Sequence, residues 1–366
     1  MTLATYEQIM KARDPSEIFT MNPRTLKEEY DSYCKMYEYG QTFQERQVFP
    51  VRGLTATAQL HFLYKKALEA LSDEENVERP KQEEGSPLLL YDNKGNLLKF
   101  EYYTHIFQRV CDTYLNDEQI LMVIPALYEE RYGFVSNFLE KVRAYFDFWR
   151  GKQGWSDFQY AVPSIIKSFK IQDNSGYAFL LQKPCKIYPL REVLNYFNGR
   201  MNVRHVISII KRLYLHACYF EIAGMTHNAI CVDNIYFSPG NEVLPGHRYS
   251  VEDIRIVGLY GGWFFTTNKN EEVKAFPQEV SDCIPRQVKK NKHSTSEVDV
   301  LAIMKVAREL LGDATGKNLF GVNSELCDWF NRDTCEENVL KDFSKFEQIC
   351  KNVYGEPTFI DIDVPT

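Results

Sequence analysis

The first 72 residues place apolar positions at the period of an α-helix. Apolar side chains recur every three or four positions in residues 26–37 and again in residues 60–71, a spacing that gathers them on one helix face. The pattern predicts two helices packed antiparallel across a loop. Residues 73–86 are highly charged and contain no apolar cluster, so they cannot contribute to a core and are expected to form a linker.

From residue 87 the pattern changes to short apolar runs that are typical of strands. Two such runs flank a polar turn and predict a β-hairpin. A later apolar run predicts a buried strand, and an amphipathic helix is expected after it. Two more strands then follow, joined by a polar turn that ends in Gly176. The expected elements are the hairpin 88–103, the strand 120–124, the helix 134–149 and the strands 165–171 and 177–182.

Beyond residue 190 the period is helical again. A long amphipathic stretch is stopped by Gly224, as a glycine commonly stops a helix; the helices are expected at 190–197, 203–223, 298–311 and 339–353. The pattern predicts an α+β protein with two lobes, a small β-rich lobe at 87–183 and a helical lobe at 184–366, preceded by a helical domain at 1–72.

Composition narrows the possible partners. The 366-residue chain has a net charge of −7, so it has no general attraction to phosphate backbones and nucleic acid is not expected as a partner. Its nine cysteines include no C-x-x-C pair, which favours reduced thiols in a cytoplasmic protein. No apolar run approaches the roughly 20 residues that cross a membrane, so no membrane partner is expected either.

The segment after the long helix resembles the catalytic loop of protein kinases. Residues 226–237 read THNAICVDNIYF, and the spacing from His227 to Asn234 matches the kinase pattern H-R-D-L-x-x-x-N. Four further segments stand in kinase order: 179–184 as the strand before the hinge, 253–260 as the strand ending in D-F-G, 283–286 as A-P-E and 296–302 as the start of the central helix. The resemblance covers about residues 88 to 355 and implies a bilobal protein kinase-like fold.

The residue types at the matched positions imply a pseudokinase. A kinase uses a catalytic-loop Asp, an Asn and a D-F-G Asp for Mg²⁺, a strand Lys and a Gly-rich loop. Here Ala229 stands at the first Asp and Gly258 is matched to the second, so only Asn234 remains as a weak candidate for cofactor binding. The strand 120–125 has no Lys, and Gly95 is alone in the hairpin turn. We therefore expect no catalytic residue, no metal and no cofactor.

Two further positions are expected to be structural. In the resemblance, His227 packs beneath the D-F-G region, and Asp299 binds the backbone near His227 and holds the loop. An alternative keeps nucleotide chemistry: Asn234 with Asp233 or Asp253 could form a rearranged metal site in a nucleotide-dependent transferase. We interpret Asp233 as structural and Asp253 as an exposed residue at the start of a strand.

The N-terminal segment has a weaker resemblance to a J domain. Residues 26–37 and 58–71 resemble its second and third helices, but Glu38-Tyr39-Gly40 stands where J domains have His-Pro-Asp. The segment could equally be an ordinary two-helix hairpin. Both halves thus lack the active residues of the families that they resemble, which favours a protein that binds protein partners as a scaffold, an allosteric regulator or an inhibitor. The second alternative is a co-chaperone adaptor that contacts an Hsp70.

Overall fold

The computed structural model describes residues 6–20, 87–107, 110–152, 155–183, 187–238 and 257–355, and the single positions 29, 30, 32, 33, 60 and 63. The chain divides into two compact units, Met1–Glu83 and Glu84–Thr366. The division lies inside the charged stretch 73–86. Each unit is described by itself.

The first unit begins with helix α1 (Tyr6–Lys11) and a 3-10 turn at Pro15–Glu17. Asp14 caps this turn and Glu17 returns a bond to the cap, so that both side chains satisfy free backbone N–H groups. Tyr33 donates its hydroxyl to Ile18 O at 3.2 Å. Positions 29, 30, 32, 33, 60 and 63 are helical. The remainder of the two expected helices, and Glu38-Tyr39-Gly40, lie outside the described residues, so the J-domain resemblance stays a prediction.

The second unit contains a five-stranded antiparallel sheet with the strand order β3-β4-β5-β7-β6. Its strands are β3 (Thr104–Phe107), β4 (Asp112–Leu115), β5 (Gln119–Pro125), β6 (Ser164–Lys170) and β7 (Gly176–Gln182). The predicted strands β5, β6 and β7 are confirmed. β3 and β4 are strands that the sequence pattern did not predict.

The predicted hairpin is present as β1 (Leu88–Tyr91) and β2 (Leu97–Phe100), but it forms a separate two-stranded sheet. Leu88, Leu90 and Leu98 pack with Phe100 against one face of the main sheet. Their neighbours in the alternation, such as Leu89 at 50% exposure, face outward. The hairpin that enters the main sheet is therefore β3–β4, and the β1–β2 hairpin covers that sheet.

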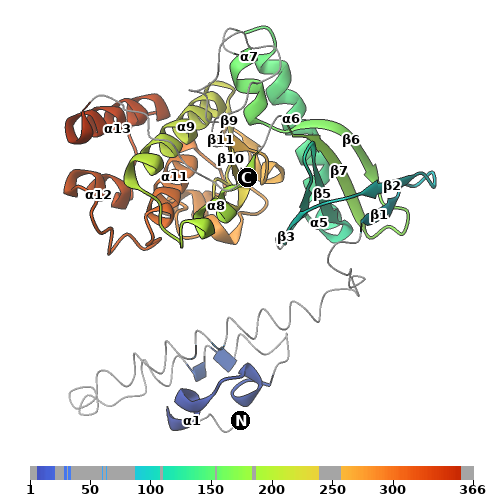
Figure 1. The fold of residues 1–366 in the computed structure, drawn as a ribbon, viewed down its shortest axis with the longest axis horizontal. Helices are drawn as coiled ribbons and strands as arrows, with labels where there is room; N and C mark the ends of the chain where they lie inside the picture. The colour runs from blue at the N-terminus through green and yellow to red at the C-terminus, as the bar shows by residue number, and fades with distance from the viewer. Residues whose placement is uncertain are drawn as a thin grey trace. The chain divides into compact units, whose positions relative to one another are not determined.

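The helical part of the unit follows the predicted order. The helices are α5 (Ala126–Tyr132), α6 (Phe134–Trp149), α7 (Trp155–Phe158), α8 (Leu190–Tyr196), α9 (Val203–Ile222), α10 (Arg286–Asn291), α11 (Ser296–Leu310), α12 (Ser324–Asn331) and α13 (Val339–Tyr354). In Figure 1 the main sheet and the helices α9, α11, α12 and α13 lie at opposite sides, with α6 and strands β10 and β11 between them. The α+β architecture with the kinase-like order of elements is confirmed.

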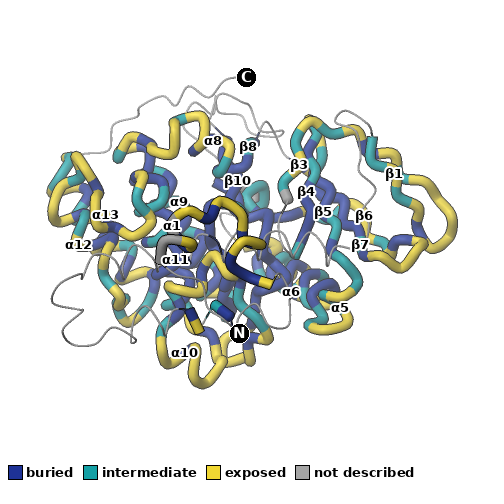
Figure 2. Tube along the Cα trace, turned by 90° about the horizontal axis from the view of Figure 1, so that it is seen from below, coloured by how far each residue is buried: buried dark blue, intermediate teal, exposed yellow. Residues whose placement is uncertain are grey.

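A small three-stranded sheet lies in the helical part, with the order β11-β10-β8. Its strands are β8 (Tyr188–Pro189), β10 (Ile235–Phe237) and β11 (Val257–Leu259). One hydrophobic core joins both parts, because residues of β5, β10, α6, α9 and α11 belong to a single cluster. Figure 2 shows β5, β10 and α11 in the buried part of the unit, whereas α10 is largely exposed.

Candidate functional site

The loop that resembles a kinase catalytic loop starts directly after α9. Strand β9 (Met225–Thr226) pairs with β12 (Thr267–Asn268), which brings residues 226 and 267 together. Asn228 adopts a left-handed backbone with φ 64°. Its side-chain amide donates to Phe265 O and to Thr267 Oγ1, both at 2.9 Å. These bonds fix the loop against the segment that follows β11.

Asp299 holds the same loop from the first turn of α11. Its two carboxylate oxygens accept the backbone N–H groups of His227 and Asn228, each at 2.8 Å. These are the contacts that the resemblance implied for Asp299. The carboxyl group is 1% exposed, and this burial raises its pKa to about 7, although the two backbone bonds act in the opposite direction.

His227 is a core residue. Its ring is fully buried and makes edge contacts with Phe220 at 5.3 Å and with Trp263 at 5.8 Å. Burial lowers the pKa of His227 to about 3, so the imidazole is neutral at physiological pH. The packing fits the structural role expected for this histidine.

Asn234, Ala229 and Gly262 meet at the centre of the site. The Asn234 amide donates to Ala229 O at 2.9 Å. A Cβ atom placed on Gly262 would lie 2.7 Å from Ala229 Cβ and 2.7 Å from Asn234 Nδ2. Gly258, by contrast, lies in β11 opposite Tyr236, and a Cβ atom placed on it would meet the Tyr260 ring at 2.3 Å. A Cβ atom placed on Gly261 would likewise lie 2.5 Å from Asn234 Oδ1. The residues that approach Asn234 are therefore Gly261 and Gly262, whereas Gly258, which was matched to the metal-binding Asp from sequence, does not lie beside it.

This arrangement decides what the centre of the site can do. The Asn and the second Asp of a kinase hold one metal ion together, so the equivalent of that Asp must lie beside Asn234. Gly262 occupies this place with φ 76°, a backbone that side chains rarely adopt. Neither Ala229 nor Gly262 has a side chain that can accept a proton or donate a lone pair to a cation. Within the described part of the chain, no group of three His, Cys, Asp or Glu side chains is arranged to hold a metal ion.

Asp233 belongs to an ion-pair network. Its carboxylate accepts two bonds from Arg191, at 2.7 and 2.8 Å, and Arg191 also donates to Glu309 at 2.6 Å. Bonding to Asp233 raises the pKa of Arg191. The network ties α8 to the catalytic-loop segment and to α11, which fits the structural interpretation of Asp233. Asp253, the other carboxylate considered for a rearranged metal site, lies outside the described residues.

Tyr236 is a buried aromatic residue next to the catalytic-loop segment. It lies on β10, two residues after Asn234, and is 2% exposed. Burial raises the pKa of the Tyr236 hydroxyl, Cys111 and other groups raise this pKa further, and hydrogen bonding to Thr113 lowers it. Thr113 is on β4 and is itself buried. Tyr260 packs edge-on against Tyr236 at 5.4 Å, and its hydroxyl donates to Tyr160 O.

The β3–β4 hairpin occupies the position of the Gly-rich loop of kinases. It precedes strand β5, but the sequence between its two strands, residues 108–111, reads QRVC and has no glycine. Gly95, considered for this role from sequence, lies in the turn of the β1–β2 hairpin. At the end of β7 the buried Lys183 donates to Asn116 O at 2.8 Å and to the Tyr103 hydroxyl. These bonds hold both flanks of the β3–β4 hairpin against the chain that leads into the helical lobe.

A second set of polar contacts ties α6 to the segment after β11. The Asn137 amide donates to Phe264 O at 3.0 Å and to Thr266 O at 2.9 Å. Lys141, 1% exposed, pairs with Glu271 at 2.7 Å and with Glu140 at 3.1 Å. Lys141 was not predicted from sequence as a buried residue. It could have been, because it lies on the apolar face of the amphipathic helix α6.

Two general expectations concern the chain as a whole. The described cysteines, at positions 111, 218, 231, 283, 327, 335 and 350, are free thiols. Among the helices that the structure describes, none is both long enough and apolar enough to span a bilayer.

Comparisons with known proteins give matches only at the level of structure. No protein-family model and no curated protein matches the chain. It is similar to the structure of vaccinia related kinase 3, with 15% identity, a TM-score of 0.43 and coverage of 74% of this chain and 77% of that one. It is also similar to a double mutant of the PknI kinase domain of Mycobacterium tuberculosis (9% identity, TM-score 0.45, coverage 68% and 94%). A third similar structure is the BubR1 kinase domain (11% identity, TM-score 0.47, coverage 78% and 91%).

At these low identities and TM-scores the likenesses say nothing about activity. The kinase-like order of elements rests on the strands, helices and loop contacts described above. These three similar structures are all kinase structures.

Proposed function

We propose that this chain is a pseudokinase, a kinase-like protein without phosphoryl-transfer activity that acts by binding a protein partner as a scaffold, an allosteric regulator or an inhibitor. The observation that carries the proposal is the meeting of Ala229, Gly262 and Asn234 at the centre of the site. Ala229 stands where a kinase has its catalytic Asp, so the base is absent. A side chain on Gly262 would clash with Ala229 and Asn234, so the carboxylate that would complete a metal site beside Asn234 does not fit there. Each such electrostatic or acid–base element is worth on the order of 10³-fold in rate.

The cleft supports the proposal independently. A kinase binds its nucleotide between the two lobes, and here Tyr236, on the strand that follows the catalytic-loop segment, is buried at 2% exposure. Because the ring is buried and both flanks of the β3–β4 hairpin are held by Lys183, a nucleotide would have to displace a packed aromatic side chain and break these bonds. We infer that the protein is closed without any nucleotide.

The contacts that hold the catalytic-loop segment in place are present, although the catalytic and metal-binding carboxylates of a kinase are not. Asp299 still accepts two backbone bonds, Asp233 still pairs with Arg191, and α6 is tied to the segment after β11 through Lys141. Such a framework preserves one defined surface, and a defined surface is what a binding protein requires. The free thiols of the described cysteines fit a reducing compartment such as the cytoplasm.

The test compares binding and catalysis in the full chain. Proteins that bind it are captured from an extract of its source cells, with ATP present or enzymatically removed, and with wild type or the Asn234→Ala variant. The same partner should be recovered in all four conditions, and no phosphate should be transferred from labelled ATP to that partner. Recovery that requires ATP or Asn234, or transfer of label above the blank, would contradict the proposal.

A further inference from the structure

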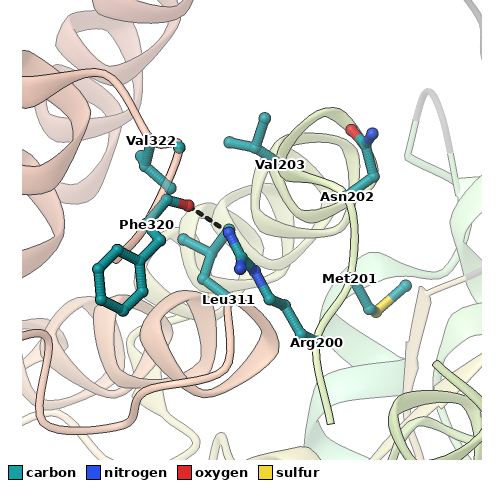
Figure 3. Close-up of a pocket in the computed structure, with 8 residues that line it drawn as sticks. Arg200, Met201, Asn202, Val203, Leu311, Phe320 and Val322 are labelled. Atoms are coloured by element: carbon teal, nitrogen blue, oxygen red, sulfur yellow. Dashed lines mark hydrogen bonds between the residues drawn. The ribbon is translucent and has the colours of Figure 1, made fainter. Parts of the chain in front are cut away.

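A pocket opens on the helical lobe, away from the cleft. It has a volume of about 320 Å³ and lies between the start of α9, the end of α11 and residues 320–322. Its apolar lining includes Val203, Leu311, Phe320 and Val322 (Figure 3). The Phe320 ring is 69% exposed, whereas Leu311 is 3% exposed. The pocket thus combines apolar side chains with polar groups, and the described residues leave it open to solvent.

One arginine lines this pocket and a second lies close to it. Arg200 lines it and donates to Phe320 O, as the dashed line in Figure 3 marks. Arg204 follows in the first turn of α9 and is exposed. The N-terminus of this 20-residue helix adds the positive end of the helix dipole. A segment that combines apolar side chains with carboxylates matches this surface.

The described chain ends beside the pocket. Tyr354 is the last residue of α13, and its ring centroid lies 5.7 Å from the Arg204 guanidinium. Arg204 directly follows Val203, which lines the pocket. The Cys327 thiol lies 3.7 Å from Val322 O on the other wall. The described end of α13 therefore lies close to the start of α9, at one side of the pocket.

Residues 356–366 have the required chemistry. They read EPTFIDIDVPT, with three carboxylates and neither Lys nor Arg. Phe359 is the fourth residue after Gly355, so an extended chain places it within about 14 Å of that glycine. The apolar and acidic positions of this segment match the apolar lining of the pocket and the two arginines.

We propose that the pocket is a peptide-docking site and that its occupant is the chain's own segment 356–366, with Phe359 seated on the apolar lining and the carboxylates beside Arg200 and Arg204. This inference does not depend on the proposed function, because neither the cleft nor Asn234 takes part in it. The docked segment would cover the exposed Phe320 ring and fix the end of α13.

The test is hydrogen–deuterium exchange of the full chain. Within the loop of the pocket, Val322 N donates to Leu319 O at 3.3 Å and Phe320 N donates to Asn318 O at 3.0 Å, so these amides report on opening of the loop. Phe359→Ala should make them exchange faster by about tenfold, the factor that corresponds to about 1.4 kcal/mol. Pro365→Ala is the matched control in the same segment and should leave exchange unchanged.

Two further measurements decide the occupant. A synthetic peptide of residues 355–366 added to the Phe359→Ala chain should restore slow exchange, and the same peptide with Ala in place of the phenylalanine should not. Val203→Asp, placed at a helix N-terminus that tolerates acidic residues, should release the acidic segment and speed exchange as Phe359→Ala does. Unchanged exchange in Phe359→Ala overturns the proposal. So does protection that rises with protein concentration, because the occupant would then be a second copy.

Discussion

Replacing Asp299 by Asn should change how the stability of the kinase-like unit depends on pH. Burial raises the pKa of Asp299 to about 7 from its ordinary 3.8, so the folded protein holds this proton more tightly than the unfolded chain. The contribution of this proton to the free energy of unfolding is fully present below about pH 4. It is lost progressively as the pH rises from there through about 7. Because one pKa unit corresponds to about 1.4 kcal/mol, wild type should lose about 2–3 kcal/mol from this group between about pH 5 and pH 7.

The Asp299→Asn side chain does not ionise, so the variant lacks this loss. It carries a fixed cost instead, because the amide NH₂ would face the N–H of His227 or Asn228, which the carboxylate now accepts at 2.8 Å. An unsatisfied buried donor costs about 1–3 kcal/mol. The variant should therefore be the less stable protein near pH 5, and the difference should shrink by about 2–3 kcal/mol by pH 8.

Urea unfolding followed by tryptophan fluorescence measures this difference, because all four tryptophans lie in the second unit. Burial also lowers the pKa of His227 to about 3 and that of His216 to about 4. Their contributions are present above the ordinary histidine pKa and are lost as the pH falls, in both proteins, so they cancel in the comparison. A stability difference that stays constant or widens between about pH 5 and pH 8 would refute the reasoning.

Four other substitutions test the packing of the site. Glu271→Gln leaves the buried Lys141 ammonium poorly paired and should destabilise the unit by about 1–3 kcal/mol, whereas Lys141→Met removes the buried charge and should cost less in the same urea assay; the reverse order would contradict the structure. Tyr236→Ala opens a cavity and should cost about 3–5 kcal/mol, and a loss below about 1 kcal/mol would mean that the ring is not packed. Gly262→Asp strains a left-handed backbone and should cost about 1–3 kcal/mol; thermal stabilisation of this variant by Mg²⁺ would show that the site can accept a carboxylate after all.

The sequence predicted the elements whose burial follows a clear period. Helix α6 was predicted at 134–149, and α9 and α13 agree with prediction within one residue at each end, because one face of each is apolar. Strands β3 and β4 were missed for a physical reason. Two of the buried positions of β4 are the polar residues Asp112 and Thr113, so no apolar alternation marks this strand.

The loop residues of the site could be matched from sequence, but the glycines beside Asn234 could not. Asn234, His227 and Asp299 were matched because the loop preserves the kinase spacing, whereas Gly258 was matched to the metal-binding Asp from its place in an apolar strand. The left-handed backbone of Gly262 and its approach to Asn234 can be seen only in the folded structure. In the sequence the sole sign of them is the Gly261-Gly262 pair. Tyr236 was likewise read as part of a short apolar strand, since its contact with Thr113 joins residues far apart in the chain.

Thermal unfolding of the full chain, with and without millimolar ATP and Mg²⁺, tests the central claim most directly. A ligand present at about 100 times its dissociation constant stabilises a protein by about 2.7 kcal/mol, which tryptophan fluorescence would register as a higher midpoint for the second unit. The account predicts an unchanged midpoint, because no carboxylate stands at Ala229 or Gly262 and a nucleotide would have to displace the buried Tyr236 ring. A Mg²⁺-dependent rise that disappears in Asn234→Ala would contradict it and would show that the cleft retains nucleotide chemistry.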